Sequence, residues 1–106
     1  MGKIPAEVMR RVMAFKKEAS RLVPIERLII FGSFARGEDR PDSDVDMIIV
    51  SKGFAGVGFL KRPVGLRLLW RRGVPVDMIC LTPEEFEDGR RKTSLVSMAV
   101  KEGVEA

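Results

Sequence analysis

Apolar residues fall along this chain in two kinds of pattern, one typical of strands and one typical of helices. Two continuous apolar runs, residues 28–31 and 47–50, have the length of buried strands. Residues 5–21 repeat apolar side chains at helical spacing, and Pro24 would end that helix before the first strand begins near Glu26. The apolar positions expected on the buried side of the first helix are Val8, Val12, Phe15, Ala19 and Leu22.

The second half of the chain predicts further helices. One is expected over residues 59–72 or 63–72, with Gly73 at its C-terminal cap. Its sheet-facing side chains would be Leu66, Leu69 and Trp70. The last helical segment begins with a Thr-Pro-Glu-Glu capping pattern at residues 82–85 and bends near Gly89.

Two aspartates at the start of the second apolar run can act together. Asp44 and Asp46 stand two residues apart, so their side chains share one face of a strand, roughly 6.5–7 Å apart along it. Two carboxylates this close repel each other unless a cation lies between them. Oxygen ligands suit Mg²⁺ or Mn²⁺, and the sequence has no histidine that would favour zinc. A polar strand edge without any ligand is the simpler alternative.

A Gly-Ser pair after the first apolar run adds a second chemical element. If Ser33 begins a short helix, its backbone N–H groups favour an anionic group. Gly32 has no side chain, so a phosphate could approach its main chain closely. Arg36 could assist as a cation, or it could be a surface charge in the Ala-Arg-Gly turn. A phosphate cradle facing a metal-binding carboxylate pair is the minimum that phosphoryl or nucleotidyl transfer requires, although a Gly-Ser pair by itself can be only a turn.

The order of these residues resembles a known family. Gly-Ser-Phe-Ala-Arg-Gly at residues 32–37, followed by Asp-Val-Asp at residues 44–46, resembles the motif of the DNA polymerase beta nucleotidyltransferase superfamily. The chain looks most like its small prokaryotic members, the minimal nucleotidyltransferases. The resemblance implies an α/β (α+β) nucleotidyltransferase fold with a mixed sheet of three to four strands and helices packed mainly on one face. Residues 1–106 are expected to form a single domain of this kind.

A third carboxylate interrupts the apolar run at residues 74–81, the predicted third strand. Asp77 is the lone acid of that run, and an unpaired buried carboxylate is costly. Either Asp77 meets solvent on an edge strand, or the strand lies beside the second one and Asp77 completes a triad with Asp44 and Asp46. The resemblance favours the triad, because the superfamily places its third carboxylate on the strand that follows such a helix.

The activity that the resemblance implies is Mg²⁺-dependent (or Mn²⁺-dependent) transfer of a nucleoside monophosphate, AMP from ATP, to a hydroxyl of an acceptor. The three aspartates would then be catalytic and metal-binding, while Gly32, Ser33 and Arg36 would bind the nucleotide phosphates. Minimal nucleotidyltransferases often work beside a helical HEPN-type toxin, as the antitoxin of a toxin–antitoxin pair, so such a partner is the expected acceptor. The alternative is a non-catalytic antitoxin, a binding module with the same fold.

Composition narrows the choice of partners. The net charge is +4, but the basic residues are scattered in pairs and aromatic residues are few, which argues against a nucleic-acid-binding protein.

No apolar run reaches membrane length and the N-terminus lacks a signal-peptide core, so a cytoplasmic protein is expected. The single cysteine, Cys80, excludes an internal disulfide and is expected in the core. The sequence leaves open a homo-oligomer, and it leaves open whether the glycine-rich residues 51–58 are a connector or a mobile loop beside the site.

Overall fold

The structure, a computed structural model, describes residues 4–70 and 74–106. In chain order the described residues form α1 (Ala6–Ala19), β1 (Arg27–Phe31), α2 (Ser33–Arg36), β2 (Val45–Val50), the 3₁₀ turns η1 (Lys52–Phe54) and η2 (Phe59–Lys61), α3 (Arg62–Arg67), β3 (Val76–Leu81), α4 (Pro83–Arg90), α5 (Leu95–Glu102) and β4 (Val104–Glu105).

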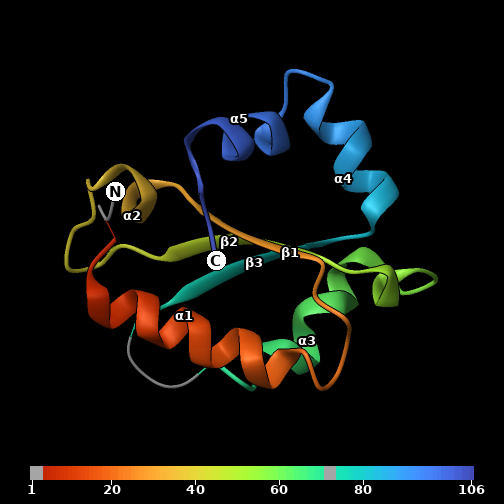
Figure 1. Ribbon diagram of the computed structural model, residues 1–106, viewed down its shortest axis with the longest axis horizontal. Helices are drawn as coiled ribbons and strands as arrows, with labels where there is room; N and C mark the ends of the chain where they lie inside the picture. Colours follow the sequence, from red (N-terminus) through yellow and green to blue (C-terminus); the bar gives the residue numbers. More distant parts are fainter. Residues whose placement is uncertain (1–3, 71–73) are drawn as a thin grey trace.

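The strands form one mixed sheet in the order β3-β2-β1-β4. β1 pairs antiparallel with β2 and with β4, whereas β2 and β3 run parallel. Because parallel neighbours need a crossover connection, the chain leaves β2, passes through α3, and returns to start β3 at the same end of the sheet as β2. The predicted mixed sheet of three to four strands is confirmed (Figure 1).

Helices cover both faces of this sheet, which differs from the expectation that they would lie mainly on one. Met47 and Ile49 of β2 belong to a core cluster with the buried face of α1. Ile48 and Val50 point to the other face, into a second cluster that includes Phe86 of α4. α1 and α3 lie on one side of the sheet and α4 and α5 on the other (Figure 1). The reason is that β1 and β2 are apolar at consecutive positions, so both of their faces need cover.

The first helix agrees with its predicted pattern except at one end. Val8, Val12, Phe15 and Ala19 are buried, as expected. Leu22, however, is 60% exposed. α1 ends at Ala19, and the Leu22 N–H donates to the Ala19 carbonyl at 2.9 Å in a tight turn. That turn takes Leu22 out of the helical repeat, so its predicted burial was wrong.

The helix expected over residues 59–72 is shorter and begins with a 3₁₀ turn, and its predicted cap at Gly73 lies outside the described residues. The side chain of Arg62, at the start of α3, is largely buried, with 8% of it exposed. Its guanidinium donates to both carboxylate oxygens of Glu85, at 2.6 and 3.2 Å, and to the Cys80 carbonyl at 3.0 Å. α3 is therefore fastened to β3 and to the start of α4.

Trp70, just beyond α3, fastens the other end of this segment. Its indole Nε1 donates to the Val74 carbonyl at 2.7 Å, and its ring meets Phe15 of α1 edge-on at 5.7 Å between centroids. Since Arg62 contacts the last part of β3 and Trp70 contacts the residues before it, α3 runs antiparallel to β3.

The C-terminal part is capped as predicted and adds a strand that was not specified. The Glu85 N–H donates to Thr82 Oγ1 at 3.2 Å, and the Thr82 N–H donates to Glu85 Oε1 at 2.8 Å, completing the capping box of α4. β4 has only two residues, Val104 and Glu105, too few for a strand pattern to be recognised. In the described ranges, no helix combines the length and the apolar character that a bilayer crossing requires.

The glycine-rich segment after β2 starts as an ordered turn. Ser51 and Phe54 are buried, and Ser51 Oγ accepts a hydrogen bond from the Gly53 N–H at 2.9 Å. This turn follows Val50, so it begins at the opposite end of β2 from Asp46. The connector interpretation therefore describes residues 51–54 better than a loop beside the aspartates.

Candidate active site

A glycine turn lies against an aspartate where β1 and β2 meet. Phe31, the last residue of β1, is the register partner of Asp46 in β2. The chain then turns at Gly32 with φ 79° and ψ −153°, a conformation that is essentially restricted to glycine. A Cβ atom at Gly32 would overlap with Oδ2 of Asp46. Because Gly32 has no side chain, the main chain of the turn and the Asp46 carboxylate can lie close together.

The short helix α2 is fixed at both ends. It begins at Ser33, as predicted, and its C-terminus closes in a Schellman motif at Gly37, where φ is 74°. The Glu38 N–H donates to the Ser33 carbonyl at 2.8 Å and the Gly37 N–H to the Phe34 carbonyl at 3.2 Å. Phe34 is buried in the α1-side core. These contacts hold Gly32 and Ser33 in place beside the sheet.

The parallel register of β2 and β3 brings two aspartates together. Asp46 and Asp77 are register partners, and neighbouring strands lie about 4.8 Å apart. Ile48, two residues after Asp46, points to the α4–α5 face, so both carboxylates lie on that face. Asp77 is exposed on the edge strand of the sheet and also lies beside Asp46, which joins the two alternatives drawn from the sequence. Asp44 is exposed and directly precedes β2.

The charges of two neighbouring carboxylates act on Asp46. The pKa of the half-buried Asp46 is raised, first by burial and then by the negative charges of Asp77 and Asp44. Arg36 acts in the opposite direction on the pKa of Asp46. An acid whose ionised form is disfavoured by two like charges is a site where a cation would be stabilised.

Arg36 lies near this edge but is already engaged. Its Nε donates to Glu38 Oε1 at 2.9 Å, and that hydrogen bond is the main reason that the pKa of Arg36 is raised. The charge of Glu102, at the end of α5, also raises the pKa of Arg36. The sequence motif did not indicate Glu38 as a partner, and Glu102 is too remote along the chain for any local pattern to reveal it.

The donor chemistry of this edge fits a divalent cation that also binds phosphate. No group of three or more His, Cys, Asp or Glu residues in the described part of the chain is gathered closely enough to hold a metal by itself. Mg²⁺ does not need such a cage, because it keeps several waters and is usually bound by one or two carboxylates plus substrate phosphates. Asp46, with its neighbours Asp44 and Asp77, supplies that kind of oxygen-only set. The arrangement suits enzymes that transfer phosphorylated groups.

Comparison with known proteins gives the family. Residues 12–104 match the family model described as "Nucleotidyltransferase domain", and the chain therefore belongs to this family of nucleotidyltransferase enzymes.

Two relatives add detail. The chain is 40% identical over 48 residues to "Putative protein adenylyltransferase MJ0141" of Methanocaldococcus jannaschii, a match that covers 43% of this chain and 48% of the relative. The chain thus spans about half the length of that curated relative. The crystal structure of "a putative nucleotidyltransferase from Sulfolobus solfataricus" is similar over 99% of this chain and 89% of its own, with 28% identity and a TM-score of 0.59. The predicted nucleotidyltransferase fold is confirmed by this similarity.

Proposed function

We propose that this protein transfers AMP from ATP to a hydroxyl group of a partner protein, in a reaction that depends on Mg²⁺ or Mn²⁺. The observation that carries the proposal is the Gly32 turn against Asp46, with Asp77 in register beside it. The name of the M. jannaschii relative supports adenylyl transfer to a protein, over the 48 aligned residues. A helical HEPN-type toxin is the acceptor that the resemblance to minimal nucleotidyltransferases implies.

The phosphates of the nucleotide would be held by the turn after β1. Gly32 lets a phosphate oxygen approach the main chain, and Ser33 offers its hydroxyl and N–H to the β and γ phosphates. Arg36 would supply positive charge beside them, with its guanidinium turning partly away from Glu38 and toward the phosphates. The exposed position of Arg36 makes that rearrangement inexpensive.

The aspartates would hold the metal at the other side of the phosphates. Asp44 and Asp46 would bind the metal of the nucleotide, and Asp46 and Asp77 would place a second. When bound, such metals neutralise charge on the phosphates and lower the pKa of the acceptor hydroxyl. In the transfer, the acceptor oxygen forms a bond to the α-phosphorus while the bond from that phosphorus to the bridging oxygen breaks. Pyrophosphate leaves and the hydroxyl proton is released.

The experiment compares Asp46→Ala with Asp88→Ala, a matched control in an exposed ion pair of α4. Titration calorimetry measures Mg–ATP affinity, and ATP labelled at its α-phosphate measures transfer to a co-purified helical partner. We expect both quantities to be lost in Asp46→Ala and kept in Asp88→Ala. Unchanged Mg–ATP affinity in Asp46→Ala would overturn the site assignment. Wild-type protein that binds the partner and never labels it would identify the non-catalytic antitoxin instead.

A further inference from the structure

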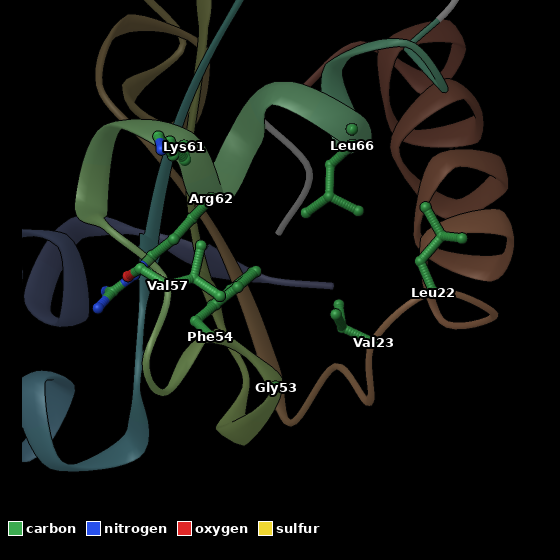
Figure 2. Close-up of a pocket in the computed structure, with 9 residues that line it drawn as sticks. Leu22, Val23, Gly53, Phe54, Val57, Lys61, Arg62 and Leu66 are labelled. Atoms are coloured by element: carbon green, nitrogen blue, oxygen red, sulfur yellow. The ribbon is translucent and has the colours of Figure 1, made fainter.

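α3 and the turn before it carry apolar side chains on two opposite sides. On the inner side, Leu66 is 3% exposed and points into a hollow of about 210 Å³, bounded by Val23 and Phe54 (Figure 2). On the outer side stands a second apolar set that the core does not use. Its members and their exposed fractions are Leu60 (83%), Val64 (62%) and Leu68 (84%).

These three residues form one continuous stripe. η2 leads directly into α3, and Leu68, the residue after α3, keeps helical angles of φ −65° and ψ −22°. Val64 and Leu68 are four residues apart and lie on the same side of the helix, and Leu60 precedes them by about one turn in the 3₁₀ turn η2. Isolated surface leucines are ordinary, but an aligned and highly exposed stripe is typical of a surface that packs on another element.

Cations border the stripe on both sides. At about 100° per residue, Lys61 and Arg67 fall on opposite sides of Val64. Both side chains are exposed, and neither has an ion pair with another residue of the described ranges. An apolar seam flanked by like charges resembles one half of a helix pair whose other half carries the opposite charge.

We propose that this stripe docks one helix of a partner protein, whose apolar face is bordered by Asp or Glu residues. A second copy of the chain is a poor occupant, because pairing the stripe with itself sets Lys61 and Arg67 against the same cations. An anionic membrane would meet only three aliphatic side chains and two cations, a small contact compared with the long amphipathic helices that lie on bilayers. A partner helix with aliphatic side chains along one face and carboxylates on both sides of them complements the apolar residues and the cations of the stripe.

The direction of α3 gives the docked helix a relation to the candidate active site. α3 runs antiparallel to β3, from Arg62 near Cys80 toward Trp70 near Val74. A helix lying along the stripe would therefore extend toward the end of the sheet where β3 begins, one residue before Asp77, although on the face opposite the two carboxylates. If the partner is the acceptor, which rests on the proposed function, its chain would continue past this end of the sheet to reach the aspartates on the other face. The docking itself requires neither metal nor nucleotide.

The probes are two synthetic helical peptides with leucines spaced four residues apart. One carries Glu on both sides of the leucine stripe, and its twin carries Lys at the same positions. We expect wild-type protein to bind the Glu peptide at least about tenfold more tightly in fluorescence anisotropy. Leu68→Glu should weaken that binding on the order of tenfold to a hundredfold. Leu95→Glu, at a 44% exposed leucine of α5, should leave it unchanged.

Charge reversal and alternative occupants complete the test. The double variant Lys61→Glu with Arg67→Glu should prefer the Lys peptide. Equal binding of both peptides, no binding, or an unreversed preference would overturn the proposal. Sedimentation that shows wild-type self-association, abolished by Leu68→Glu, would assign the stripe to a second copy. Tighter binding to anionic vesicles than to the Glu peptide, lost in Leu68→Glu, would assign it to a membrane. Because none of these measurements uses ATP, they stand or fall separately from the transfer reaction.

Discussion

Replacing Gly32 with alanine tests whether the turn and the Asp46 carboxylate form one site. Two costs are expected. Holding a residue with a side chain at φ 79° and ψ −153° costs about 1–3 kcal/mol. The new Cβ also overlaps with Asp46 Oδ2, so the carboxylate must move. Because Asp46 is only half-buried and can swing, we expect this overlap to add about 1 kcal/mol, at the low end of overpacking costs.

Two matched backgrounds separate these costs. Gly56 has the same φ of 79° with nothing within 4 Å of its would-be Cβ, so Gly56→Ala measures the cost of a positive φ without any overlap. In an Asp46→Ala background, Gly32→Ala meets no carboxylate and should keep only the strain. The double-mutant cycle should therefore give a coupling of about 1 kcal/mol between residues 32 and 46.

Urea unfolding followed by circular dichroism supplies the free energies, and calorimetry supplies Mg–ATP affinity for the same proteins. Gly32→Ala should lose nucleotide affinity, since both the phosphate approach and the carboxylate position change. The reasoning would be refuted if Gly32→Ala destabilised no more than Gly56→Ala and bound Mg–ATP like the wild type. Gly32 would then be only a turn residue.

Three further predictions use the charged groups. Asp77→Asn should slow transfer by a factor on the order of 10²–10⁴ while Mg–ATP affinity is kept. Full activity of this variant would mean that Asp77 is only a polar residue of an edge strand. Because burial and the charges of Asp77 and Asp44 raise the folded-state pKa of Asp46 above its ordinary value of 3.8, ionised Asp46 opposes folding. Asp46→Asn should thus be more stable than wild type at neutral pH, and this advantage should fade as the pH falls through the raised pKa toward 3.8. A difference in urea midpoints between Asp46→Asn and wild type that does not change with pH would contradict this prediction. Glu85 has a pKa lowered chiefly by its hydrogen bond to Arg62, so its stabilisation is present above 4.5 and is lost as the pH falls through the folded-state pKa. Because the Glu85 side chain is 44% exposed and its ion pair is screened by solvent, Glu85→Gln should cost about 0.5–1 kcal/mol at pH 7 and nearly nothing in strong acid. Equal losses at both pH values would exclude the ion pair as the cause.

The sequence predicted those features of the fold that depend on residues close together in the chain. The strands β1 and β2 follow from apolar runs, and the start of α2 follows from Gly32 and Ser33 together. The capping box at Thr82 could be predicted because its two partners are three residues apart. The neighbouring position of Asp77 required the resemblance as well, since a parallel register between β2 and β3 depends on the crossover through α3.

Contacts between residues far apart in the chain could not be predicted from local sequence patterns. The ion pair of the largely buried Arg62 has its partner, Glu85, 23 residues away, which is beyond the reach of any local pattern. The cover on both sheet faces was also missed, although the consecutive apolar residues of β1 and β2 carried the signal. Leu22 failed for the opposite reason, because a helical repeat was extended past the turn that ends α1.

The hydrogen bonds that fasten α3 have a further effect on how the protein behaves at high concentration. The Pro75 and Leu81 carbonyls accept bonds from β2, so the Val74 and Cys80 carbonyls point outward from the edge of the sheet. An outward strand edge is a template on which strands of other molecules can add. Trp70 and Arg62 donate to these two carbonyls and so shorten the free edge from both ends. The side chains that hold α3 in place thereby protect this sheet against edge-to-edge aggregation.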